Sequence, residues 1–294
     1  MTPLDQLIQA VLSSPKYKTV CPDLVEHLGQ QELAKRRSLK EAVKAVKNKL
    51  HQIGGAYLAE KMLYAAWLDE LQVAQSPHPV AGATPLSHWE RGKDEGFLPP
   101  AAHEIGPLSN LRPVCARILS HHASTRERLP ILDQFYTTLL AGLPPIHTVL
   151  DLACGLNPLT TPWLPQLANI EYYAYDIYQD MMDFLNGFFA IAGVNSRAEA
   201  ADIIHACPTR PADLVLLLKT IPCLEQVDKS AGARLLDSLN APHLLVSFPA
   251  HSLGGRSKGM TAHYAAHFEA LAAGKHWQIQ RFEFPGELVF RVSR

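Results

Sequence analysis

The chain has few cysteines, no long apolar run and almost no net charge. Its 5 cysteines are far apart and form neither a C-x-x-C pair nor a zinc-ligand spacing, which favours free thiols in a reducing cytoplasm. The 14 histidines are scattered, so we expect no metal site. No apolar run approaches the roughly 20 residues that cross a bilayer, and the N-terminus lacks the layout of a signal peptide. We therefore expect a cytoplasmic protein without a membrane partner.

A net charge of −1 excludes a chain that is basic over its whole surface, but it allows a local basic face. The segment 35–49 indicates such a face, because its charged residues are all basic except Glu41. Lysines three or four positions apart lie on one stripe of a predicted helix, beside its apolar stripe. The lysines of this stripe are Lys40, Lys44 and Lys47.

The pattern of apolar residues and prolines divides the chain into three segments. Residues 1–75 are predicted to form a small helical domain, with helices over 3–13, 22–33, 38–52 and 60–72. Residues 76–113 are rich in proline and are predicted to form an irregular linker or flap, with a short helix near 86–91. Residues 114–294 form the third segment.

The third segment predicts an α/β fold. After helices over 114–120 and 125–141, strands are predicted at Thr148–Ala153, Glu171–Tyr175, Ala198–Asp202, Asp213–Leu218, His243–Phe248, Trp277–Phe284 and Glu287–Val292. Helical stretches separate the first five strands, which predicts a parallel sheet covered on both faces. Only Pro285-Gly286 separates the last two strands, so these should form an antiparallel hairpin at the edge of the sheet.

The segment 148–158, with the sequence TVLDLACGLNP, carries the strongest functional signal. An apolar strand that contains Asp151 ends in the small residues Ala153, Cys154 and Gly155. Ligands of doubly wound folds lie beyond the carboxyl ends of such strands, and small residues let a ligand approach the backbone. No G-x-G-x-x-G fingerprint is present, which disfavours a dinucleotide cofactor. The segment is similar to the first motif of S-adenosylmethionine-dependent methyltransferases, and the predicted sheet resembles their class I, Rossmann-like fold.

Acidic residues near the ends of the predicted strands could bind the amino acid, ribose and adenine groups of S-adenosylmethionine. Asp151 and the turn at 153–155 suit the amino acid end, and Asp176, after the second strand, suits the two ribose hydroxyls. Asp202 and Ile203, at the end of the third strand, suit the adenine edge. The alternative for each acid is a cap of the following helix.

Three further segments hold candidate functional residues. In 122–128 we interpret Ser124 and Glu127 as a capping box, which leaves Arg126 to clamp the cofactor carboxylate. Lys219, after the fourth strand, either faces the methyl acceptor or is a solvated lysine. The glycine-rich loop at 247–260 contains Arg256 and Lys258 and suits a phosphate backbone, with a solvated loop as the alternative.

Together these motifs resemble the aminoglycoside-resistance 16S ribosomal RNA methyltransferases, which act on N7 of guanine 1405. The resemblance rests on His122–Arg128, Val149–Pro158, Leu218–Glu225, Ser247–Met260 and the N-terminal segments Lys16–Asp23 and Lys49–Tyr57. It implies S-adenosylmethionine as methyl donor and the assembled 30S subunit as substrate. It also implies that the N-terminal helical domain docks on the ribosome. The segment 76–113 is longer than expected for the family, and Ala250-His251 stands where the family leads us to expect a more basic residue, which weakens the expectation of RNA contact there.

The resemblance also assigns roles to residues. It places in the cofactor pocket Tyr57, His122, Ala123, Ser124, Thr125, Arg126, Glu127, Arg128, Ala153, Gly155, Asp176, Asp202, Ile203, Leu218 and Gln226. Lys219 and Arg126 are the predicted catalytic residues, and Lys40, Lys44, Lys47, Arg256 and Lys258 the predicted RNA contacts. Trp163 or Phe248 is a hypothetical stacking partner for the extruded base, with a place in the core as the alternative.

Other functions remain open from the sequence. The first is a methyltransferase for another RNA site, a small molecule or a protein, which the basic segments disfavour. The second is a non-catalytic RNA-binding module, which the acids Asp151, Asp176 and Asp202 disfavour. We expect no DNA partner and a monomeric protein.

Overall fold

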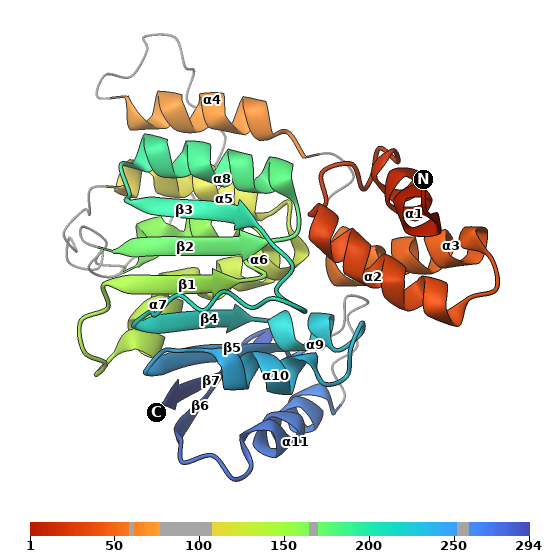
Figure 1. The fold of residues 1–294 in the computed structure, drawn as a ribbon. Coiled ribbons are helices and arrows are strands. Elements are labelled where there is room, and N and C mark those ends of the chain that lie inside the picture. Colours follow the sequence, from red (N-terminus) through yellow and green to blue (C-terminus); the bar gives the residue numbers. More distant parts are fainter. Residues whose placement is uncertain (59–61, 77–107, 165–169, 252–258) are drawn as a thin grey trace, which may run out of the picture.

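A computed structural model describes residues 1–58, 62–76, 108–164, 170–251 and 259–294 of the chain. These residues form a seven-stranded sheet with helices around it, and a separate group of N-terminal helices lies beyond the carboxyl ends of the parallel strands (Figure 1). None of the helices in these ranges is long and apolar enough to cross a membrane.

The sheet has the order β3-β2-β1-β4-β5-β7-β6. The parallel strands are β1 (Thr148–Leu152), β2 (Glu171–Asp176), β3 (Ser196–Ala200), β4 (Leu214–Leu218) and β5 (His243–Pro249). The hairpin of β6 (Gln278–Phe284) and β7 (Glu287–Ser293) joins antiparallel to β5 through β7. The prediction of five parallel strands and a terminal hairpin is therefore confirmed. Every residue of β4 is buried, which is typical of a strand covered on both faces.

The helices around the sheet differ in part from those expected. The helix predicted over 125–141 is wrong, because α6 (Ala123–Arg128), a 3₁₀ turn (Leu129–Ile131) and α7 (Leu132–Leu140) replace it. Pro130 lies at this break, and proline lacks the N–H that a continuous helix needs. No helix separates β3 from β4, since residues 201–213, all described, are irregular. β3 also begins and ends two residues before its predicted bounds.

The remaining helices complete the layers. They are α5 (Arg112–Leu119), the 3₁₀ helix η4 (Asn157–Trp163), α8 (Gln179–Ala192), α9 (Thr220–Leu224), α10 (Ala231–Ser238) and α11 (Met260–Ala272). The short helix expected near 86–91 and the loop residues Arg256 and Lys258 lie outside the described residues.

The N-terminal helices pack on one another through apolar stripes. They are α1 (Pro3–Leu12), α2 (Pro22–Lys35) and α3 (Leu39–Leu50), and a π-helical turn (His51–Gly55) follows them. Thr2 and Asp5 form a capping box that starts α1. We call α1, α2, α3 and this turn the N-terminal unit. α4 (Tyr64–Gln75) lies instead against α8, where the Tyr64 ring stacks on Phe184 with centroids 5.1 Å apart (Figure 1).

Backbone hydrogen bonds join the N-terminal unit and its flanking residues to the sheet. The Cys21 amide donates to the Ile177 carbonyl at 2.7 Å, and the Gln179 amide donates to the Thr19 carbonyl at 2.7 Å. The Ala123 amide donates to the Tyr57 carbonyl at 2.9 Å. Ile177 and Gln179 follow β2, so these bonds seat the unit over the carboxyl end of the sheet.

Candidate active site

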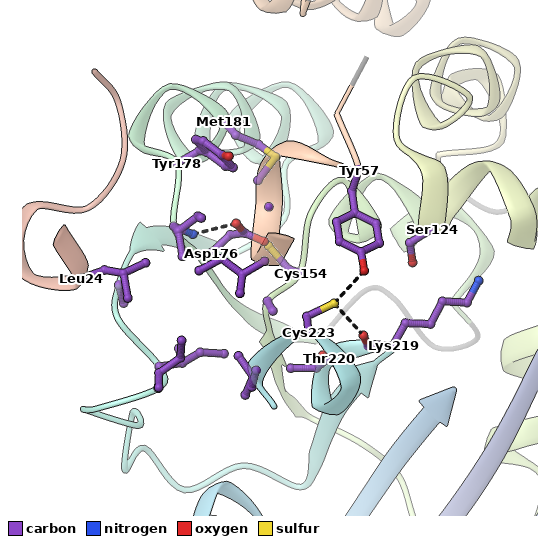
Figure 2. Close-up of a pocket in the computed structure, with 18 of the residues that line it drawn as sticks. Leu24, Tyr57, Ser124, Cys154, Asp176, Tyr178, Met181, Lys219, Thr220 and Cys223 are labelled. Carbon is purple, nitrogen blue, oxygen red and sulfur yellow. Dashed lines mark hydrogen bonds between the residues drawn. The ribbon is translucent and has the colours of Figure 1, made fainter. Parts of the chain in front are cut away.

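A cavity of about 760 Å³, including the part that is open to solvent, lies at the carboxyl ends of β1, β2 and β4. The N-terminal unit and its flanking residues contribute Leu24, Ile53 and Tyr57 to its lining. Figure 2 shows Leu24 and Tyr57 at this cavity together with Asp176, from the end of β2. The structure brings nine residues predicted from the sequence into the lining: Tyr57, His122, Ser124, Ala153, Asp176, Asp202, Ile203, Leu218 and Lys219. This edge of a parallel sheet is where ligands of doubly wound folds bind.

The backbone is strained at two strand ends beside the cavity. Ala153 (φ 54°) and Lys219 (φ 60°) are the only non-glycine residues in the described part of the chain with positive φ. Gly155 (φ 52°) follows Ala153, and an added Cβ there would lie 2.8 Å from the His122 ring. Non-glycine residues keep this conformation only where their surroundings enforce it, and such positions concentrate at functional sites.

Asp176 connects the ends of β1 and β2. Its Oδ2 accepts a hydrogen bond from the Gly155 amide at 2.8 Å, and its Oδ1 accepts one from the Ile177 amide at 2.6 Å. Burial raises the pKa of Asp176 above its usual value, while these two hydrogen bonds act in the opposite direction. Each oxygen retains a lone pair, so the carboxylate could accept two hydroxyl groups of one ligand.

His122 presents an unused polar atom near the cavity. Its Nδ1 is buried and has no hydrogen-bond partner among the described residues. Burial, followed by the nearby positive charges of Arg128 and Lys219, lowers the pKa of His122 to about 4, so the ring is neutral at pH 7. A buried nitrogen without a partner is costly, which favours a ligand that satisfies it.

Cys223, on α9, was not predicted as a site residue. Its thiol lies 3.2 Å from the Tyr57 hydroxyl and 3.3 Å from the Lys219 carbonyl oxygen (Figure 2). Burial raises the pKa of Cys223 to about 11, so the group is a thiol rather than a nucleophilic thiolate at neutral pH.

Lys219 does not present a free ammonium group to the cavity. Its Nζ lies 2.6 Å from Glu127 Oε2 and 3.6 Å from Glu287 Oε2, and the side chain is 7% exposed. Glu127, predicted to contact the cofactor, thus binds Lys219 and does not line the cavity. The solvated alternative for Lys219 is wrong, because the side chain is buried and paired.

Arg128 belongs to the protein core rather than to the cavity wall. Its guanidinium donates to both oxygens of Glu287, at 3.0 and 2.7 Å, and to Asn157 Oδ1 at 2.8 Å. Glu287 also accepts a hydrogen bond from Ser247 at 2.6 Å. Because Glu287 comes from the terminal hairpin, this network joins β7 to the segments on either side of β1.

Asp151 is likewise buried in the core. Its Oδ2 accepts hydrogen bonds from the Tyr172 hydroxyl at 2.7 Å and from the Asn157 side-chain amide at 2.9 Å. It does not line the cavity, so the structure does not place it at the amino acid end of a bound cofactor.

Other predicted residues lie outside the lining as well. Thr125 is buried and donates to the Leu119 carbonyl at 2.6 Å, and Ala123 is also buried. Arg126 and Gln226 are exposed, so their proposed cofactor contacts remain predictions. The capping-box interpretation of Ser124 and Glu127 is wrong, because His122 is the N-cap of α6 and no side chain caps that helix.

The predicted RNA contacts in the described residues are not equivalent. Lys40 and Lys44 are exposed on α3, whereas Lys47 donates to the Ser14 hydroxyl at 2.6 Å. A depression beside these lysines is lined mainly by Lys35, Arg36, Arg37, Lys44, Lys49, Glu32 and Glu41.

Neither aromatic residue proposed for base stacking lines the cavity. Phe248 is fully buried and stacks on Tyr264. Trp163 donates its Nε1 to Asp133 at 2.8 Å. The core alternative therefore holds for Phe248, and no base-stacking role follows for Trp163.

Comparison with known proteins agrees with this geometry. A family model described as ribosomal RNA methyltransferase (FmrO) matches residues 100–291. The chain is 36% identical to a 16S rRNA (guanine(1405)-N(7))-methyltransferase of Micromonospora rosea, over 99% of this chain and 97% of the relative. It is 33% identical to a protein of the same name from Serratia marcescens, over 99% and 98%. The crystal structure of the 16S rRNA methyltransferase RmtF with S-adenosyl-L-homocysteine superposes with a TM-score of 0.74, at 31% identity, over 100% of this chain and 99% of that one.

Proposed function

This chain belongs to the ribosomal RNA methyltransferase (FmrO) family, and from that premise we propose that it methylates N7 of guanine 1405 in 16S rRNA. S-adenosylmethionine is the methyl donor. The observation that carries the proposal is the cavity at the carboxyl end of the sheet, in which Asp176 holds the turn at Gly155 and keeps acceptor capacity toward the interior.

The residues around the cavity fit this donor. Asp176 would accept the ribose hydroxyls, and Asp202 with Ile203 would hold the adenine edge. His122 Nδ1 and the Gly155 turn would meet the amino acid end, where Nδ1 would gain the partner that it lacks. Arg126 is exposed on α6 and does not line the cavity, and its guanidinium would bind the carboxylate of the cofactor from outside the cavity.

Guanine N7 has a lone pair and no proton, so its attack on the methyl group requires no general base. When bound, S-adenosylmethionine would supply a methyl group on a positively charged sulfur, which would keep the electron pair of the sulfur–carbon bond as N7 gains the methyl carbon. The protein therefore acts by alignment and by exclusion of water. The buried Lys219 is held by Glu127 and Glu287, and the Cys223 thiol keeps its proton, so neither competes as a nucleophile.

The target base lies within folded RNA, so we propose that it is extruded into the cavity mouth. Lys40 and Lys44 on the exposed face of α3 would contact the RNA backbone of the assembled 30S subunit in the cytoplasm, with the protein acting as a monomer. Methylation of N7 adds a positive charge to the decoding site. Repulsion and steric conflict would then exclude the 4,6-disubstituted deoxystreptamine aminoglycosides.

Primer extension on 16S rRNA tests the proposal, after chemical cleavage at N7-methylguanine. Cells that express the wild-type chain should give a stop at position 1405, and cells that express Asp176→Ala should give none. Purified protein offered intact subunits, naked RNA and small acceptors should methylate the subunits. Methylation of a small acceptor instead, or binding of RNA without any transfer, would support the two alternative functions.

A further inference from the structure

Two histidines from distant parts of the chain meet the carboxylate that is assigned to the adenine edge. His27 Nδ1, on α2, lies 2.8 Å from Asp202 Oδ2, and His205 Nδ1 lies 2.6 Å from the same oxygen. The two imidazole rings are tilted by 30° with centroids 4.5 Å apart. His27 is thus a direct side-chain link between the N-terminal unit and the cofactor cavity.

The distances indicate hydrogen bonds rather than a metal centre. These three residues are the one group in the described part of the chain with a metal-like ligand set. Ligand atoms around a tetrahedral zinc ion, with bonds of about 2.0–2.1 Å, are separated by about 3.4 Å. Both nitrogens lie closer than that to Asp202 Oδ2. Gln31 Nε2 lies 3.0 Å from His205 Nε2, which suits a His205 ring that donates through Nδ1 and accepts through Nε2.

The protein itself fills all the acceptor positions of Asp202. A carboxylate offers about four lone-pair sites, two on each oxygen. Oδ1 accepts from the amides of Ile204 at 3.0 Å and His205 at 3.2 Å, and Oδ2 accepts from the two imidazoles. The Asp202 side chain is only 2% exposed, so water cannot readily supply a replacement.

The exocyclic amine of adenine can therefore reach Asp202 only by replacing a donor. His27 is the donor that leaves most easily, because its side chain is 41% exposed and its ring can be rehydrated. His205 is 18% exposed and is also held by Gln31. Leu24, one turn before His27 on α2, lines the same cavity, which puts this helix beside the adenine end.

We propose that His27 and the adenine amine of the cofactor compete for one acceptor on Asp202, so that cofactor binding breaks a bond between α2 and the pocket. This rests on the proposed assignment of Asp202 to adenine. Cofactor occupancy thereby loosens the attachment of the helical unit that carries Lys40 and Lys44. By reciprocity, anything that pulls α2 away from Asp202 strengthens cofactor binding.

Calorimetry with two ligands and two proteins tests this competition. The ligands are S-adenosylhomocysteine and its purine analogue without the 6-amino group, and the proteins are wild type and His27→Ala. His27→Ala should bind S-adenosylhomocysteine about three- to tenfold more tightly, as loss of one competing hydrogen bond from a partly exposed side chain allows, and should bind the analogue unchanged. The exposed neighbour variant Gln30→Ala should match wild type with both ligands.

The outcomes separate this proposal from the pocket assignment. Unchanged or weaker binding of S-adenosylhomocysteine to His27→Ala, or equal tightening with both ligands, would overturn the competition. Equal affinity of His27→Ala for the two ligands would show that adenine does not reach Asp202. Failure of wild type to bind S-adenosylhomocysteine at all would instead refute the cofactor pocket.

Discussion

Replacement of Asp151 by asparagine is expected to remove a pH-dependent loss of stability. The side chain is buried in the core beside Tyr172 and Asn157. Burial raises the pKa of Asp151 from 3.8 to about 6, although the two hydrogen bonds and the nearby Arg128 act in the opposite direction. At neutral pH the folded protein therefore contains a carboxylate whose charge its surroundings disfavour.

The sign and size follow from the two pKa values. The pKa of Asp151 is higher in the folded protein than in the unfolded chain. Between the two pKa values, the Asp151 carboxyl therefore stays protonated in the folded protein but is ionised in the unfolded chain. The contribution of Asp151 to the free energy of unfolding is at its full value below about pH 4 and falls as the pH rises to about 6. One pKa unit corresponds to about 1.36 kcal/mol, so the rise from 3.8 to about 6 corresponds to about 3 kcal/mol.

Urea unfolding followed by tryptophan fluorescence measures this effect. Asp151→Asn keeps the size and an acceptor oxygen for Tyr172, but it cannot ionise. The free energy of unfolding of the variant minus that of wild type should rise by about 3 kcal/mol between about pH 3 and pH 7. Other titrating groups, such as His122, are present in both proteins and cancel.

A difference that stays constant over this pH range would refute the reasoning. Cofactor affinity gives an independent control, because Asp151 does not line the cavity. We expect Asp151→Asn to bind S-adenosylhomocysteine as wild type does at a pH where both proteins are folded.

Three further changes have distinct expected results. Asp176→Ala should abolish cofactor binding in calorimetry, since it removes the carboxylate that holds the Gly155 turn and that we propose binds the ribose hydroxyls; unchanged affinity would show that the pocket is misassigned. The double variant Lys40→Glu with Lys44→Glu should impair binding of 30S subunits in filter binding while it spares cofactor affinity, and equal loss of both would make α3 structural. Glu287→Leu leaves the guanidinium of Arg128 buried without its carboxylate and should lower the free energy of unfolding by about 3–5 kcal/mol in urea melts. A loss under about 1 kcal/mol would contradict the ion-pair geometry.

The central strands β1, β4 and β5 were predictable because each is a short, mainly apolar run between turn residues. The run Leu214–Leu218 has no polar residue, so it identifies a strand buried on both faces wherever it lies in the sheet. The break at Pro130 was visible in the sequence as well, and proline should have outweighed the apolar spacing on either side of it.

The cavity was predictable only in part. Asp176 and Ala153 were found because a residue at the carboxyl end of a parallel strand has a known place relative to the sheet. Leu24 and Cys223 were missed because they belong to helices, where an apolar or small residue has the same appearance in a core and in a cavity wall. The pattern Y-D-I-Y at 175–178 offered a signal for Tyr178, which follows Asp176 by two residues and also lines the cavity.

Sequence patterns over short distances are enough to define the α/β architecture, the turn at 153–155 and the family. The alternation of strands and helices, the small residues of a turn and the spacing within a motif all involve residues that are close together in the sequence. These patterns cannot separate Asp151, in the core, from Asp176, in the cavity, because both are acids at or near the carboxyl ends of mainly apolar strands and only packing places one of them at the cavity. Nor can they join His27 to Asp202, which are 175 positions apart. That contact exists because the N-terminal unit packs on the carboxyl end of the sheet. Packing between segments so far apart in the chain produces no repeating pattern of residues that the sequence could reveal.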